Sequence, residues 1–510
     1  MKPSHAPVVA ALTGLVAGLV AGLVALVVVF VVGAVRPPFA AAAEADAGWR
    51  KRVTLLFSDR LRYESVDWFD PNPGQYAPGA ERYDFWGNQL RLGARLKLDH
   101  VSVTVEGQDT RVLGLPDDAT RPTSPGNLGV GGNYFQHTPE TDQGATFLKQ
   151  AFVNGHFGGF NATVGRFEWG EGVETLPEDA ALLWLKRSRI TERLIGPFGY
   201  THAARSLDGA RLWYDRPTWN VTALGVRPTA GGFEVSAGEE LDEITILGLS
   251  AGAKRMPWNA PADGRAFYFH YDDSRVEDGV PVRVDNRPPV VRAADREAIR
   301  LSTLGGHVAT VAKAGPGRVD GLLWGAWQGG DWGAQGHSAH AFALEAGYQM
   351  PGWFGRPWLR AGVNIASGDD AATDATHGTF VPMIPTPRMY ALTPFYTAMN
   401  LDDRFVQVIV KPHAKIAVRV DYHDLHLAES TDLWYAGGGA NRSDIFGYGG
   451  LASSGSDDLA DLIDVGVTAG PAHHVTLYGY FGRVLGGDVV EGLFARGNAN
   501  YGYLEATYRW

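Results

Sequence analysis

The chain ends with Tyr501-Gly502-Tyr503-Leu504-Glu505-Ala506-Thr507-Tyr508-Arg509-Trp510, a stretch that alternates between apolar and polar side chains. This period of two predicts a β-strand. Its apolar face carries Leu504, Ala506, Tyr508 and Trp510, and its polar face carries Glu505, Thr507 and Arg509. A terminal strand of this kind can pair with the first strand and close the sheet. Only a closed sheet leaves no unpaired edge, which is the condition for a sheet to survive in lipid.

The same alternation recurs along the chain, most clearly at 90–98, where leucines and one alanine alternate with Arg91, Gly93, Arg95 and Lys97. The predicted strands are joined by connections that are alternately short and long. Short ones lie at 158–159, 216–217, 314–317, 351–357, 411–413 and 470–473, and long ones at 66–83, 115–145, 170–204, 272–303, 368–400, 428–459 and 486–498. The short connection at 331–336 is the exception. We predict an all-β fold, a transmembrane antiparallel outer-membrane β-barrel of about 18 strands.

Composition supports this fold class and excludes several functions. The 510 residues include 65 Gly, 15 Trp and 19 Tyr but no Cys, so disulfides, thiolate metal sites and cysteine nucleophiles are excluded. Many turns and interfacial aromatic residues are typical of membrane barrels. The formal net charge of -11 argues against nucleic-acid binding.

The N-terminus carries an uncharged run from Pro3 to Val35 after Lys2, then small residues at Ala41 and Ala43. This pattern favours a cleaved export signal at 1–43, with a retained helical anchor as the alternative. We therefore expect residues 44–510 to form the barrel.

One segment departs from the β pattern. Pro177-Glu178-Asp179 precedes Ala180–Leu194, with acidic residues first and basic residues later, as a helix dipole favours. The helix lies in a long loop. It either folds inward and constricts the barrel or packs on the rim, and the sequence leaves both open.

The polar phase of the strands should face a water-filled interior, because about eighteen strands enclose more space than side chains fill. The predicted lumen-lining cations are Arg91, Arg95, Lys97, Arg211, Arg360, Lys415 and Arg419. Arginine binds carboxylates in bidentate geometry, so successive weak sites would guide an acidic polymer. The alternative is that these cations pair with Glu106, Asp208, Asp421 and Asp464 in structural networks.

No catalytic site is predicted, because no serine motif accompanies a histidine and a third group. Asp421, His423, Asp424 and His426 do not converge in a strand, since the last two face opposite to the first two. We therefore predict no metal site and no cofactor, and no nucleotide-binding loop is present.

Three motifs resemble the alginate export family of outer-membrane proteins: 164–172 with 205–212, 366–370 with 379–380 and 385–387, and 427–438. The resemblance implies a large monomeric barrel with an arginine-rich conduit for a polyuronate. On this resemblance Arg166 and Arg211, on the matched strands, are the best candidates for lining the path, and the candidate path also includes Asp208. Arg166 is out of phase with Asn161 and Thr163, so a bulge would be needed to turn it inward.

The resulting prediction is a Gram-negative outer-membrane channel that passes anionic solutes, in particular an alginate-like polysaccharide or its oligomers. Periplasmic export proteins and outer-membrane lipid are the expected partners. The alternatives are a general or small-solute porin with structural arginine–acid networks, and a barrel enzyme acting at the rim.

Overall fold

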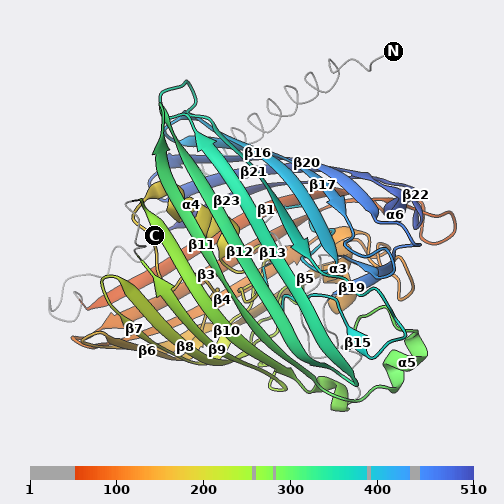
Figure 1. Ribbon diagram of the computed structural model, residues 1–510, viewed down its shortest axis with the longest axis horizontal. Coiled ribbons are helices and arrows are strands. Elements are labelled where there is room, and N and C mark those ends of the chain that lie inside the picture. The colour runs from red at the N-terminus through yellow and green to blue at the C-terminus, as the bar shows by residue number, and fades with distance from the viewer. Residues whose placement is uncertain (1–51, 255–259, 279–282, 387–391, 437–447) are drawn as a thin grey trace.

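The computed structural model describes residues 52–254, 260–278, 283–386, 392–436 and 448–510 (Figure 1). The predicted signal segment 1–43 lies outside the described residues. No helix in the described ranges is both long and apolar enough to cross a membrane.

Eighteen long strands form a single closed antiparallel sheet. The first nine are β1 (Val53–Asp67), β3 (Arg82–Lys97), β4 (Val101–Leu113), β5 (Asp142–Phe157), β6 (Phe160–Phe167), β7 (Leu207–Asp215), β8 (Trp219–Pro228), β9 (Ile244–Ala253) and β10 (Ala262–Asp273). The others are β11 (Ile299–Ala314), β12 (Gly317–Trp332), β13 (Gln335–Gln349), β14 (Trp358–Ala366), β16 (Leu401–His413), β17 (Ile416–His426), β20 (Asp458–Ala472), β21 (Val475–Gly486) and β23 (Asn498–Arg509). The predicted fold class is confirmed.

The barrel closes between the last and the first strand, as the sequence of the terminal strand predicts. β23 pairs antiparallel with β1 over ten residues, from Ser58 opposite Arg509 to Asp67 opposite Asn500. The other edge of β1 pairs with β3. Every barrel strand therefore has two neighbours, and no edge is exposed to lipid.

The connections are sorted by length onto the two ends of the barrel. Two residues join β11 to β12 and β16 to β17, whereas long connections precede β3, β5, β7, β9, β11, β16, β20 and β23. The short β12–β13 turn is the predicted exception. Short turns are periplasmic and long loops extracellular in outer-membrane barrels, which assigns the two ends.

The long connections carry the remaining elements, and α5, β15, β22 and α6 lie toward one end of the barrel (Figure 1). The short strands are β2 (Asp70–Pro71), β15 (Thr376–His377), β18 (Leu433–Ala436), β19 (Gly449–Ala452) and β22 (Phe494–Arg496). The helical elements are α3 (Gly129–His137), α4 (Ala180–Leu185), the π-helical turn η2 (Lys186–Ile190), the 3-10 turn η3 (Arg275–Asp278), α5 (Pro289–Ala294) and α6 (Asp488–Glu491).

Side chains alternate between the outer and the lumenal face along each strand. Leu304 on β11 is 61% exposed and Leu323 on β12 is 56% exposed, whereas Thr303 and His307 are buried toward the lumen. Alternating apolar residues outward and polar residues inward is the pattern that lipid imposes on a barrel wall.

The lumen differs from the water-filled interior that strand number predicts, because long connections fold into it. A continuous buried cluster joins wall residues with apolar side chains from α3, from α4 and from the β14–β16 connection, such as Tyr134, Leu185 and Phe380. Burial of these side chains removes apolar surface from water and so holds the connections inside the barrel.

Candidate functional site

The β6–β7 connection, residues 168–206, crosses the lumen, and we call it the lumenal loop. α4 begins after Asp179, whose side chain accepts hydrogen bonds from the backbone N–H groups of Ala181 and Leu182. This N-cap satisfies donors that a helix start leaves unpaired. The predicted helix is thus confirmed at its start, but it is shorter than Ala180–Leu194, since η2 ends at Ile190.

One side of the lumenal loop is bonded to the wall formed by β10, β13 and β14. Lys186 Nζ lies 2.7 Å from both carboxylate oxygens of Asp263, and Arg189 Nε lies 2.9 Å from Glu345 Oε1. Arg193 donates to Asn364 Oδ1 at 3.2 Å. The structure therefore decides between the two sequence alternatives for this loop, which folds inward.

Both ends of the same loop are bonded to β1, β3 and β5, far away around the barrel from β10, β13 and β14. At its start, Arg91 donates both terminal guanidinium nitrogens to Glu168, at 2.7 and 2.9 Å, and Lys149 lies 3.2 Å from the same carboxylate. Arg62 donates to the carbonyl of Tyr200 at 2.7 Å. The loop thus spans the lumen from wall to wall.

The loop also reaches through the depth of the barrel. Arg318, the second residue of β12 after a periplasmic turn, contacts Asp179 at the start of α4. A solute crossing the barrel must therefore pass this loop.

Glu345 is the centre of the densest charge network, and it is buried. Arg189, Arg193 and Arg360 approach its carboxylate at 2.9, 3.3 and 3.0 Å. Arg360 also lies 3.1 Å from Asp320. Such a network holds the loop only while every charge keeps its partner, because an unpaired buried charge is strongly destabilising.

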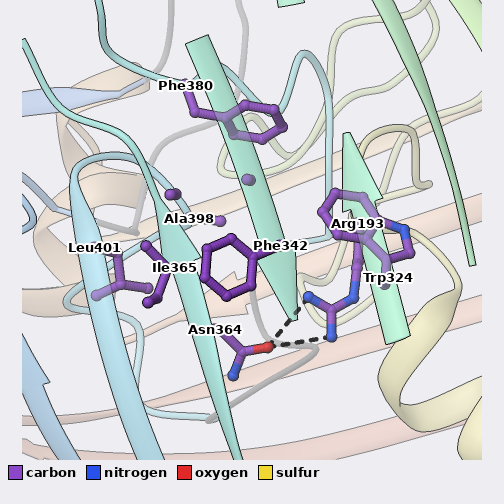
Figure 2. A pocket seen from close by; sticks show the side chains of 10 residues that line it. Arg193, Trp324, Phe342, Asn364, Ile365, Phe380, Ala398 and Leu401 are labelled. Carbon is purple, nitrogen blue, oxygen red and sulfur yellow. Dashed lines mark hydrogen bonds between the residues drawn. The ribbon is translucent and has the colours of Figure 1, made fainter. Parts of the chain in front are cut away.

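A small pocket opens beside this network, next to Arg193 and Asn364 (Figure 2). The Arg193 guanidinium lies 5.1 Å from the ring centroid of Trp324, a cation–π contact. Phe380 and Leu401 supply apolar lining. The pocket therefore combines one cation and one amide with apolar walls.

Six of the sequence-predicted residues lie on strand positions in phase with the lumen, and one of them, Lys97, is exposed at the end of β3. Arg91 and Arg360 are ion-paired as described, and Arg419 contacts Asp421. Arg95 is exposed and donates to Thr104 Oγ1 at 3.2 Å. Arg211 lies with its guanidinium 4.2 Å from the ring centroid of Trp213.

Arg166 and Asp208 depart from the expectation, because their strand phase places them on the outer face. They stand opposite each other on β6 and β7 and form an ion pair at 2.5 Å. Val164 and Leu212, in the same phase, are 55% and 54% exposed. The bulge that would turn Arg166 inward is absent, since the pairings of β6 show no register shift.

Lys415 also departs from its predicted place. It lies in the two-residue turn between β16 and β17, is exposed, and donates to the carbonyl of Pro471 at 2.9 Å. The alternation beginning at Ile416 does not extend through this turn, so a strand phase does not apply to it.

Sequence reasoning missed several lumenal cations, including Arg62, Arg189, Arg193 and Arg265. Arg62 could have been found, because it alternates with Leu61 and Tyr63. Arg189 and Arg193 share one side of the predicted helix Ala180–Leu194 at the i, i+4 spacing. Which acids they would meet depended on the direction of the loop.

Two of the motifs noted in the sequence meet at Asp432 in the extracellular loops. Its carboxylate accepts hydrogen bonds from the backbone N–H of Asp369 at 3.0 Å and from Thr379 Oγ1 at 2.6 Å. Tyr435 also donates to it, at 2.9 Å. Burial raises the pKa of Asp432 to about 6. These contacts bring residues of the two motifs, far apart in sequence, together in the fold.

The family model described as "Alginate export" matches residues 62–499, from β1 to β23. The chain belongs to the alginate export family. No curated protein matches it significantly.

Among solved structures, Acinetobacter baumannii OccAB2 is similar with a TM-score of 0.56 at 8% identity, covering 91% of this chain and 99% of that chain. Pseudomonas aeruginosa OccK2 (OpdF) in complex with glucuronate has a TM-score of 0.50 at 8% identity, covering 90% and 96%. P. aeruginosa OpdK with vanillate has a TM-score of 0.51 at 8% identity, covering 89% and 98%. At these identities the likeness shows the shared barrel fold.

Membership in the alginate export family and the closed barrel together identify an outer-membrane channel of a Gram-negative cell. In this member the lumenal loop and its ion pairs lie across the lumen. They constitute the candidate functional site.

Proposed function

We propose that this channel exports an alginate-like polyuronate, or its oligomers, past the lumenal loop. The observation that carries the proposal is the family match over 62–499, which includes nearly the whole barrel. Lumenal guanidinium groups on several strands and on the loop support it, because guanidinium binds carboxylates in bidentate geometry. The glucuronate bound by OpdF is a uronate monomer held by a barrel of the same fold.

The proposed path includes Arg91, Arg95, Arg211, Arg360 and Arg419. Arg95 and Arg211 are the best probes because both lie on lumen-phase positions. Arg95 hydrogen-bonds the neutral Thr104, and Arg211 stacks on the neutral Trp213. The other three hold acidic partners and would act on a substrate only by exchanging those partners. Arg166, Asp208 and Lys415 are left out of the path because of their positions.

The test is a planar bilayer recording with the purified channel, first in a KCl gradient and then with mannuronate oligomers. We expect anion selectivity and block by the oligomers. Arg95→Gln and Arg211→Gln should each weaken the block about fivefold, as roughly 1 kcal/mol of a partly screened charge contact implies. Arg111→Gln is the matched control, because Arg111 pairs with Asp109 on the outer face. A cation-selective or unselective pore that ignores uronates would overturn the proposal.

A small-solute porin is the second candidate, and the pairing of lumenal arginines with acids favours it. Those pairs, such as Arg62 with Glu505 at 2.6 Å, reduce the charge available to a polymer. This candidate predicts passage of monomeric anions without block by oligomers, so the same recordings separate the two.

We further propose that one barrel is the working unit, that residues 1–43 are removed on export, and that periplasmic proteins deliver the substrate. Sedimentation in detergent tests the first point, and N-terminal sequencing of the mature protein tests the second.

A further inference from the structure

A second cluster of polar side chains lies on the lumenal face of β17 and β20. Asp421 and His423 are two residues apart on β17 and therefore share a face, and Asp464 stands directly opposite Asp421 on β20. One ligand atom from each of the three side chains lies within 4.8 Å of the other two. All three residues are at most 1% exposed.

These side chains present atoms with unused hydrogen-bonding capacity. Asp421 Oδ1, Asp464 Oδ2 and His423 Nε2 are buried and have no hydrogen-bond partner in the described part of the chain. Gln407 stands opposite Asp421 on β16, and both of its amide heavy atoms are likewise buried and unsatisfied. Buried polar groups are nearly always hydrogen-bonded, so these neighbouring unsatisfied groups are available to bind an ion or another ligand.

The imidazole of His423 is oriented by a neighbouring acid. His423 Nδ1 lies 2.8 Å from Asp403 Oδ1, and the other oxygen of Asp403 accepts from Asn364 Nδ2 at 2.9 Å. With its proton on Nδ1, the ring leaves the lone pair of Nε2 available to bind an ion. Histidines that bind metals almost always donate their other N–H to such an acceptor.

We propose that Asp421, His423 and Asp464 bind one divalent transition-metal ion, Zn²⁺ or Mn²⁺, with Gln407 as a further oxygen donor. Two carboxylates balance the charge of the ion. An imidazole ligand suits these metals, whereas Ca²⁺ and Mg²⁺ take oxygen ligands. Arg419 contacts the second oxygen of Asp421 and orients that carboxylate.

The lumenal loop reaches the neighbourhood of the site through Phe405. Arg189 lies with its guanidinium 4.4 Å from the ring centroid of Phe405, and the Phe405 ring lies 5.7 Å from that of His423. A bound ion would join β17 to β20 and position the wall on which the loop rests. This inference does not depend on which solute the channel carries.

The test uses the full barrel isolated in detergent and stripped with a chelator. Titration with Zn²⁺, and with Mn²⁺ followed by electron paramagnetic resonance, should show one bound ion per chain and nitrogen coupling from one imidazole. His423→Gln should lower the affinity at least about tenfold. Asp403→Asn should lower it about 10- to 100-fold, as loss of a metal ligand's hydrogen-bond partner does.

His426→Gln is the matched control. His426 lies on the same strand with Asp424, in the opposite phase, and should leave the affinity unchanged. Folding of each variant is checked by heat-dependent mobility on gels, and Asp464→Asn replaces any variant that does not fold. Equal affinities in His423→Gln and His426→Gln, or no binding by the unaltered chain because the acids share a proton instead, would overturn the proposal.

Discussion

At the scale of single residues, Glu192 links the lumenal loop to pH. It lies in the loop with a positive φ of 64°, and burial raises the pKa of its carboxyl to about 7 from 4.5, with nearby Glu171 and Glu168 adding to the rise. Protonation therefore favours the folded loop. This contribution to stability is complete below about pH 4.5 and is lost as pH rises through about 7.

We expect channel conductance to increase as pH is raised from 5 to 8, because the loop loosens when Glu192 ionises. Glu192→Gln should hold the conductance near its low-pH value. Bilayer recordings across this range measure both. An unchanged pH profile in the variant would assign the titration to another group.

A substitution of Arg360 tests, at the same scale, how much the buried charge network contributes to stability. Arg360→Met leaves Asp320 and Glu345 with less compensation in a buried place, so the free energy of unfolding should fall by about 3–5 kcal/mol. Urea unfolding in detergent measures this change. Arg111→Met, on the exposed outer pair with Asp109, should leave stability unchanged.

At the scale of elements, the lumenal loop is the part that must move if the channel is to open. Its Ile195 forms a parallel bridge with Ile384 of the β14–β16 connection, and Gly196 N–H donates to the carbonyl of Ile384 at 2.9 Å. Both isoleucines are fully buried. The two connections therefore move together or separate at this bridge.

A disulfide can test that movement, because the chain contains no cysteine that would compete. In Ile195→Cys with Ile384→Cys, oxidation should lower the conductance, and reduction should restore it. Ile195→Cys alone is the control and should not respond to oxidant. Equal conductance in the oxidised and reduced double variant would show that transport does not require separation at this bridge.

At the scale of the whole molecule, the outer surface is a belt of apolar side chains around a closed ring. Leu323, near the middle of β12, is 56% exposed to the lipid. Leu323→Arg should make folding into bilayers less favourable by about 2–4 kcal/mol, since a charge costs most at the bilayer midplane.

The matched control is Leu485→Arg, near the extracellular end of β21, where the expected loss is about 0–1 kcal/mol. Folding titrations in lipid vesicles measure both losses. Equal losses at the two positions would contradict the assigned position of the membrane.

The sequence alone determined the barrel. Alternation with period two, as in 501–510, assigns each side chain to a face, and the lengths of the connections assign the ends, because both patterns are local consequences of strand geometry. The start of α4 was predictable for the same reason, because its N-cap depends only on neighbouring residues. Arg91, Arg95, Arg211, Arg360 and Arg419 were placed in the lumenal phase for the same reason.

Only the tertiary structure decided what fills the lumen and which charges meet there. The inward path of the lumenal loop depends on contacts between residues more than a hundred positions apart, such as Arg189 and Glu345. Arg166 lies on the outer face because β6 has no bulge, so Arg166 faces the same way as Val164. The family motif by itself did not determine which way it faces. Asp464 lies beside Asp421 and His423 because β20 pairs with β17, although a long connection separates these two strands in the sequence. Alternation assigns a side chain to a face, but the closed ring and its infolded loops select its partner.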